Sequence, residues 1–231
     1  MAVGALHILI SMTARPLRLM VYDRTCRGLP LLPGLTHTWV LGAWLYWMMG
    51  RLDDWRGVES WEEALGWILE RASDERIAEI QVWCHGQWGN ARINEDILDV
   101  DSLSPGHPHH ELLFAISRLM MKGADGLWWF RTCQTYGARA GHELAGRLTD
   151  LLGCRTAGHT FIIGPWQSGL HTLMPKEIPS WPLSEGIAAG TPKAPVRALW
   201  SRPGRPNSIT CLHGRIPEGV LAQGTRDSTS D

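Results

Sequence analysis

The chain lacks an excess of charge of either sign. Lysine and arginine total 22, aspartate and glutamate total 23, and the formal net charge is -1. No segment concentrates basic residues in the way that a phosphate-binding surface requires. We therefore expect no nucleic acid among the partners of this protein.

Paired cysteines are also missing. The five cysteines are odd in number, widely spaced and form no CxxC pair, which argues against a zinc ribbon or a disulfide scaffold. Free thiols are typical of a reducing compartment, and residues 1–10 lack the positive charge that opens a signal peptide. These two features predict a cytoplasmic protein.

Long apolar runs and cofactor motifs are absent as well. The longest apolar run, 35–50, is too short to span a bilayer comfortably and predicts a buried or interfacial helix, so we expect no membrane partner. No glycine loop with its acidic partner is present to hold a dinucleotide. His107, His109 and His110 form a local cluster around Pro108 and are expected in a solvated loop that enters a helix, not in a metal site. The sequence therefore predicts no cofactor and no metal.

What the chain does have is a regular alternation of strands and helices up to residue 164. Strands are predicted at 18–23, 77–84, 126–132 and 155–163, and helices lie between them. Ser60 and Glu63 form a capping box, and Pro108 stands where a helix can begin. Such alternation predicts an α/β fold, in which a mostly parallel sheet carries helices on both faces.

The amino-acid composition changes after Pro165. Residues 175–206 are rich in proline, glycine and serine, and the segments 196–200 and 208–213 are predicted to pair as a late hairpin. We therefore predict a main domain over residues 1–175 and a C-terminal extension over 176–231 that packs on the same domain.

Two reactive residues stand at the carboxyl ends of predicted strands, where α/β proteins place their sites. His85 ends the strand that begins at Ile77, and Cys133 ends the strand that begins at Gly126. A cysteine thiolate is a strong nucleophile, and a nearby imidazole lowers the thiol pKa and protonates a leaving amine. The backbone amides of Gly86 and Cys133 are candidates for an oxyanion hole, since a glycine permits close approach of a substrate oxygen.

At these residues the sequence resembles a known group of enzymes. A strand followed by His85-Gly86, a helix, a second strand followed by Cys133-Gln134-Thr135, and a leucine-rich helix are similar to the caspase-like clan of cysteine peptidases. That clan includes caspases, metacaspases, clostripain-like peptidases and CHAT-type proteases. The resemblance spans roughly residues 18–164. It implies a caspase-like three-layer sandwich, a His–Cys dyad and hydrolysis of a peptide bond in a protein or peptide substrate.

Two features depart from the family pattern. Thr132 stands where many members have a small residue, and the segment after Gly164 matches no part of the family. Two hypotheses therefore stay open. The first is a cysteine endopeptidase in which Cys133 attacks and His85 transfers protons. The second is a catalytically silent caspase-like module that binds a protein partner, with the segment Trp39–Trp47 as its apolar contact face.

Arg131 gives a sharper expectation about substrate. Strand side chains alternate, so Arg131 and Cys133 point to the same side. In the resembling family the residue two before the cysteine often lines the pocket for the side chain that precedes the cut. A guanidinium there predicts a preference for aspartate or glutamate. The alternative is that Arg131 pairs with an internal acid such as Asp125 or Glu143.

Three neighbouring positions complete the predicted site. Cys84 is expected to point to the opposite face of its strand and into the core. Asp23, at the end of the first strand, is one candidate to orient His85, and a backbone carbonyl is another. The resemblance does not require a third catalytic side chain, so this role stays unassigned.

Overall fold

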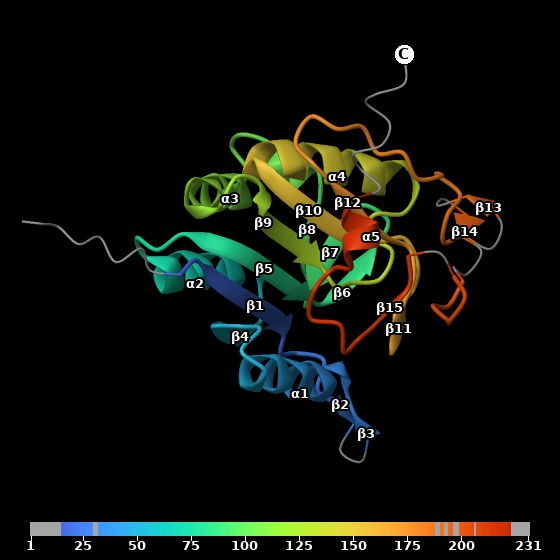
Figure 1. Ribbon diagram of the computed structural model, residues 1–231, viewed down its shortest axis with the longest axis horizontal. Helices are drawn as coiled ribbons and strands as arrows, with labels where there is room; N and C mark the ends of the chain where they lie inside the picture. Colours follow the sequence, from blue (N-terminus) through green and yellow to red (C-terminus); the bar gives the residue numbers. More distant parts are fainter. Residues whose placement is uncertain are drawn as a thin grey trace, which may run out of the picture.

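The computed structural model describes residues 15–29, 32–187, 190–191, 194–195, 199–205 and 207–222. A six-stranded central sheet has the order β12-β10-β9-β5-β1-β4 (Figure 1). Its strands are β1 (Leu17–Asp23), β4 (Asp54–Val58), β5 (Ile77–Trp83), β9 (Gly123–Phe130), β10 (Cys154–His159) and β12 (Leu170–Leu173). Neighbouring strands are parallel except β10 and β12, which are antiparallel. The predicted α/β class with a mostly parallel sheet is confirmed.

Helices connect the parallel strands. They are α1 (Leu35–Met48), α2 (Trp61–Ala72), α3 (Pro108–Leu119), which a 3-10 turn at Asp101–Leu103 precedes, and α4 (Ala138–Leu152). The short α5 (Glu218–Leu221) follows the last strand. The predicted cap of α2 is present, because Ser60 Oγ accepts the Glu63 N–H at 3.1 Å. Gly153 takes a φ of 65° and ends α4 in the left-handed conformation that favours glycine.

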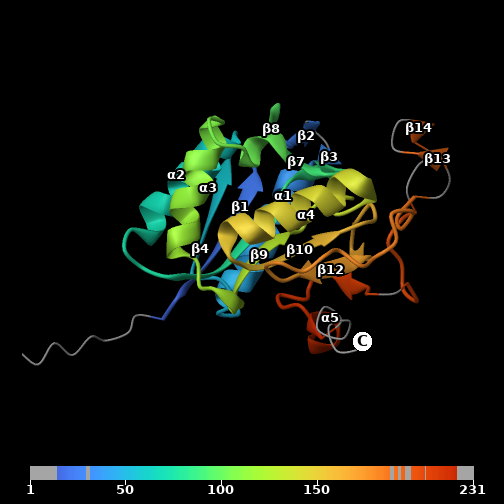
Figure 2. The same cartoon turned by 90° about the horizontal axis from the view of Figure 1, so that it is seen from above.

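Alternation along the strands divides the core into two layers. In β1, Leu19 and Val21 pack with helices α2, α3 and α4, while Met20 and Tyr22 pack against α1. Figure 1 shows α3 and α4 on the opposite side of the sheet from α1, and Figure 2 shows the same layers from above. The sheet is therefore flanked by helices on both faces, an arrangement compatible with a three-layer sandwich.

The C-terminal segment lies on the same face of the sheet as α1. Ile209, Ile216 and Val220 are buried in a cluster with Trp129 of β9 and Leu170 of β12. This cluster covers the part of the sheet that α1 leaves open. The extension is thereby in contact with the central strands.

Short strands form four smaller sheets. The largest consists of β6 (His85–Gln87), β7 (Asn90–Ile93) and β8 (Asp96–Leu98). The polar, alternating sequence of 90–101 predicts either a surface hairpin or an extended loop, and the structure has the hairpin, formed by β7 and β8. The others pair β2 (Gly28–Leu29) with β3 (Leu32–Pro33), β11 (Trp166–Gln167) with β15 (Ile209–Thr210), and β13 (Gly190–Thr191) with β14 (Ala194–Pro195).

The prediction that 196–200 and 208–213 pair as a late hairpin is wrong for the residues that the structure describes. Residues 196–198 lie outside the described residues. Trp200 forms a bridge with Ile162, and Ile209 and Thr210 pair with β11. Burial of the Ile209 side chain against the central sheet explains this choice of partner.

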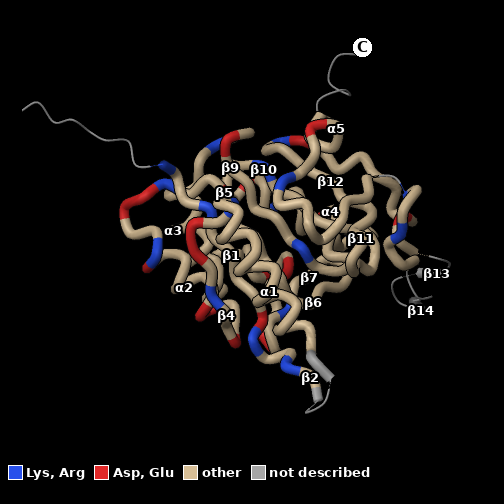
Figure 3. The backbone as a smooth tube through the Cα atoms, turned by 60° about the horizontal axis from the view of Figure 1, so that its bottom comes forward, with Lys and Arg blue, Asp and Glu red and all other residues tan. Residues whose placement is uncertain are grey.

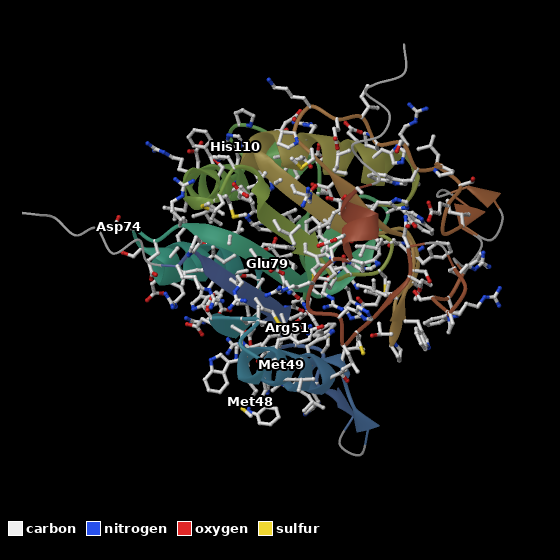
Figure 4. The ribbon with its side chains drawn as sticks, in the orientation of Figure 1. Met48, Met49, Arg51, Asp74, Glu79 and His110 are labelled. Atoms are coloured by element: carbon white, nitrogen blue, oxygen red, sulfur yellow. The ribbon has the colours of Figure 1, made fainter. Side chains whose placement is uncertain are left out.

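Helix α1 is apolar on both sides. Its inner side buries Trp39, Ala43 and Tyr46, whereas Trp44 and Met48 on its outer side are 47% and 61% exposed. Figure 4 shows Met48 on the side of α1 that faces away from the sheet. In the described part of the chain, no helix is both long and apolar enough to cross a bilayer.

Candidate functional site

The strands that carry His85 and Cys133 are neighbours. β5 and β9 pair in parallel, with Glu79 opposite Leu127 and Val82 opposite Phe130. The sequence placed each residue at a strand end but left the adjacency of the two strands undecided. Because parallel neighbours end at the same edge of a sheet, His85 and Cys133 emerge at one edge.

The chain segments that follow these strands are in direct contact. The Gly89 N–H, in the turn between β6 and β7, donates to the Thr135 carbonyl at 3.1 Å. Thr135 Oγ1 donates in return to the Asn90 carbonyl at 3.1 Å. The hairpin that begins at His85 and the turn that holds Cys133 are therefore fixed to each other by hydrogen bonds from both sides.

Gly86 lies where these two segments approach most closely. A Cβ atom added at Gly86 would lie 2.5 Å from the Cys133 carbonyl oxygen and would also meet Thr135 Oγ1. Real side chains do not tolerate such a distance, so only glycine fits between the hairpin and the turn. Contact with the cysteine turn therefore requires a glycine at this position.

The Cys133 thiol is held by the loop that follows β10. Its Sγ atom accepts the Ile163 N–H at 3.4 Å, and the next residue, Gln134, donates its N–H to the Phe161 carbonyl at 3.0 Å. Gln134 has a φ of 57°, a left-handed conformation that is costly for a residue with a side chain and is common at functional turns. Burial raises the pKa of the Cys133 thiol, and the Ile163 amide opposes this effect.

No hydrogen bond joins Cys133 Sγ to the His85 imidazole in this conformation. The His85 ring lies edge-on to the indole of Trp39, with 6.2 Å between ring centroids. Asp23 does not orient His85, because its carboxylate accepts from the backbone N–H groups of Thr25 and Asn94 at 2.7 and 3.1 Å. Catalytic hydrogen bonds are often absent or long until a substrate is bound.

Cys84 points away from this edge, as predicted. Its side chain belongs to the core cluster beneath α2, α3 and α4, and burial raises the pKa of its thiol well above the ordinary value. The Cys84 side chain is buried, whereas that of Cys133 is half-buried, so the two thiols differ in access from solvent. Cys133 is therefore the cysteine that shares the sheet edge with the histidine.

A cavity of about 190 Å³ opens beside His85. It is lined by residues of the β6–β7–β8 sheet and by the residue after the cysteine, namely His85, Gly86, Gln87, Asn90, Arg92, Ile97 and Gln134. Arg92 is the permanent charge among these lining residues. Neither Arg92 nor Gln134 was predicted from the sequence, although the alternation of apolar and polar residues around Arg92 is a signal for an outward-facing arginine.

Arg131 does not line this cavity. Its side chain is only 2% exposed, and its guanidinium donates to Gln167 Oε1 at 2.7 Å, to Tyr46 Oη at 2.6 Å and to the His213 carbonyl at 2.9 Å. All three acceptors are neutral, and neither Asp125 nor Glu143 is among its partners. Arg131 is thus engaged by neutral acceptors within the protein, and the internal acids considered as alternatives are not its partners.

The surroundings of Arg131 are aromatic and poorly hydrated. Its guanidinium carbon lies 4.6 Å from the ring centroid of Trp83 and 4.4 Å from that of Trp129. Burial lowers the pKa of Arg131, and the Tyr46 hydroxyl opposes this effect. The carboxyl of Glu79, labelled in Figure 4, interacts electrostatically with Arg131, and burial raises the pKa of this carboxyl to about 6.

The histidines of the α3 entrance are structural. His109 Nε2 contacts Asp96 Oδ1 at 2.9 Å, and the same aspartate accepts the N–H of Trp61 at the start of α2. Within the described ranges no group of His, Cys, Asp and Glu side chains is arranged to hold a metal ion. Figure 3 shows basic and acidic residues interspersed along the backbone.

Comparison with known proteins gives no family assignment. No protein-family model matches the chain, and no curated protein is significantly similar to it.

Proposed function

We propose that this protein is a cysteine endopeptidase with a His85–Cys133 dyad and a caspase-like fold. The observation that carries the proposal is the joining of two chain segments at one sheet edge. The hairpin that begins at His85 is hydrogen-bonded to the turn that holds Cys133, and a cavity lies directly beside the histidine. A nucleophile, a proton carrier and a concave surface are the parts that acyl transfer requires.

The fold supports the caspase-like assignment. The central sheet is parallel except at its β12 edge, and the histidine and cysteine follow adjacent strands in the middle of the sheet. The adjacency of the two strands supports the proposal, and the helices on both faces of the sheet are compatible with a three-layer sandwich. The fold alone does not imply an activity, so the proposal depends on the residues of the site.

In the proposed reaction the Cys133 thiol loses its proton to His85 and attacks the scissile carbonyl carbon. The amides of Gly86 and Cys133 hold the resulting oxyanion. The C–N bond then breaks, His85 protonates the departing amine, and a thioester remains on Cys133. Water, deprotonated by His85, attacks the thioester carbon and releases the acid product together with the free thiol.

The resting conformation sets one requirement for this reaction. Cys133 Sγ is bound to the Ile163 amide, and burial raises its pKa. The thiol therefore must turn from Ile163 toward the imidazole, which requires a change of rotamer. We propose that a bound peptide favours this change, because it fills the cavity beside His85 and excludes water.

Covalent labelling tests the proposal. The purified protein is treated with iodoacetamide and with peptide electrophiles, and the labelled residue is mapped by mass spectrometry. We expect peptide labelling at Cys133 that is lost in Cys133→Ala and falls at least tenfold in His85→Ala, since general acid–base catalysis contributes about 10²–10⁴-fold. Cys211→Ala is the matched control, because Cys211 is also half-buried and free. Labelling that is independent of His85 would refute the dyad.

A second candidate function is a silent module that binds a protein. The observation in its favour is the exposed apolar side of α1, where Leu41 is 63% and Trp47 is 50% exposed. Peptide electrophiles that never label Cys133, together with a partner whose binding is lost in Trp44→Ser and Leu41→Ser, would favour this function over the peptidase.

A further inference from the structure

Helix α1 carries two rows of side chains, and the described part of the chain covers only one of them. The inner row recurs at intervals of three and four residues and is buried, namely Thr36, Trp39, Ala43 and Tyr46. An outer row has the same type of spacing and is exposed, namely His37, Leu41, Trp44 and Met48. Side chains at such intervals lie on one face of a helix, so α1 has a second face of the kind that packs against another element.

The outer row exposes a large apolar surface. Leu41, Trp44 and Met48 are 63%, 47% and 61% exposed, and Trp47 beside them is 50% exposed. These four side chains together offer roughly 500 Å² to solvent, which is at the upper end for the largest apolar patch of a monomer. Two such surfaces bury about 1,000 Å² when they meet, which is the lower limit for a specific interface.

The composition of α1 indicates what covers this face. Residues 35–50 contain no aspartate, glutamate, lysine or arginine, so two copies of the surface meet without like-charge repulsion. A helix that lies on a membrane carries lysine and arginine on its polar face, and α1 has neither. The outer row is spaced by four, three and four residues, which is the spacing at which paired helices interlock. These observations favour a second copy of the chain as the occupant.

We propose that two copies of this chain associate through the outer rows of their α1 helices, packed antiparallel about a twofold axis. In such an interface residue i of one copy meets residue j of the other, and j meets i. The midpoint of the outer row lies between Leu41 and Trp44, so each Leu41 packs against the Trp44 of the other copy.

The antiparallel arrangement pairs each indole with a smaller side chain and brings opposite ends of the two helix dipoles together. The surface is a helix face and includes neither edge strand of the central sheet, β4 or β12. The inference goes beyond the proposed peptidase activity and does not depend on it.

Sedimentation of the full chain at concentrations from about 1 to about 200 µM tests the proposal. We expect a reversible equilibrium between monomer and dimer with a dissociation constant in the micromolar range. Trp44→Ser should weaken the dimer at least hundredfold, because a twofold interface loses the indole twice and buried aromatic residues dominate interface affinity. Leu41→Ser should weaken it as well. Phe114→Ser is the matched control, since Phe114 is 49% exposed and belongs to α3, on the other side of the sheet (Figure 1).

A mixture of two charged variants tests the antiparallel pairing. Leu41→Glu and Trp44→Lys each place a charge against an apolar side chain, so each variant alone should be monomeric over the same range of concentration. In the mixed dimer the two introduced charges face each other, and the second contact between Leu41 and Trp44 is unchanged. We expect the mixture to form a dimer whose affinity is within about tenfold of that of the parent.

A chain that remains monomeric up to about 200 µM would overturn the proposal, as would a dimer that Trp44→Ser and Phe114→Ser weaken equally. Binding of the monomeric chain to phosphatidylserine vesicles, lost in Trp44→Ser, would assign the face to a lipid surface and overturn it too. Charged variants that do not recover when they are mixed would overturn the antiparallel arrangement.

Discussion

Replacement of Arg131 by glutamine is expected to destabilise the protein and release its C-terminal segment. The guanidinium connects three separate parts of the chain: the end of β9, which Arg131 follows directly, Tyr46 of α1, and the carbonyl of His213. It also donates twice to Gln167 of β11, through Nε at 3.2 Å and Nη2 at 2.7 Å. Glutamine is too short to reach these acceptors together.

The magnitude follows from the acceptors that lose a donor. Gln167 Oε1 and the His213 carbonyl lose their contacts to the guanidinium, at about 1–3 kcal/mol for each buried group left unsatisfied. Tyr46 Oη still donates to the Cys211 carbonyl, at 2.5 Å. Removal of a buried cation recovers part of the loss, because desolvation opposes its burial. We expect a net decrease of about 3 kcal/mol in the free energy of unfolding, which is a fall in Tm of about 6–12 °C for a chain of this size.

Two assays check this prediction. Thermal and urea unfolding give the global change, and hydrogen exchange reports whether amides of 209–216 lose protection before those of β5 and β9. A double-mutant cycle with Tyr46→Phe should show coupling, since the two side chains are in contact at 2.6 Å. A decrease below about 1 kcal/mol with unchanged protection of 209–216 would refute the view that Arg131 holds this segment on the sheet.

Three further predictions concern single residues. Gly86→Ala should lower the free energy of unfolding by about 1–3 kcal/mol and reduce peptide labelling of Cys133, because the new Cβ would lie 2.5 Å from the Cys133 carbonyl oxygen. Urea unfolding and labelling measure the two effects. Gly66→Ala is the control: no atom lies within 4 Å of a Cβ at this position, so the change should stabilise α2 by up to about 1 kcal/mol. Glu79 has a pKa of about 6 when folded against 4.5 when unfolded, so the folded state binds more protons between these values and stability falls as pH rises through this window. The Glu79→Gln protein should therefore be up to about 2 kcal/mol more stable than the parent above pH 6, and the two should be equally stable below pH 4.5. Urea unfolding at a series of pH values measures this difference. A difference that does not change with pH would contradict the prediction. Cys84 should resist iodoacetamide until the protein unfolds, since its thiol is buried and its pKa is raised, and native-state labelling of Cys84 would refute its place in the core.

The Cys133 thiol in this structure differs from that of an activated nucleophile. Cys133 is bound to Ile163 and has a raised pKa, whereas a poised nucleophile has a lowered one. If a bound peptide turns the thiol toward His85, the rate of labelling by peptide electrophiles should exceed that by iodoacetamide far more in the parent than in His85→Ala. The same comparison separates a peptidase activated by its substrate from a silent binding module.

The sequence by itself determined the class of fold and the positions of its main elements. Alternating apolar strands and capped helices predicted β1, β5 and β9 within a few residues, because hydrophobic periodicity and capping are local signals. It also placed His85 and Cys133 at strand ends and Cys84 in the core, since side chains alternate along a strand. The short polar strands around Asn90 were anticipated only as a hairpin or an extended loop.

The tertiary structure decided what depends on contacts between distant segments. That β5 and β9 are neighbours, that Gly86 fits against Cys133, and that Arg92 stands beside His85 all follow from strand pairing, which no local pattern specifies. The surroundings of Arg131 could not be predicted for the same reason. The face of the strand to which it points was predictable, but its burial depends on Tyr46 and His213, which lie 85 and 82 residues away in the sequence. Local sequence fixes the side to which a residue points, and only the assembled chain decides what it meets there.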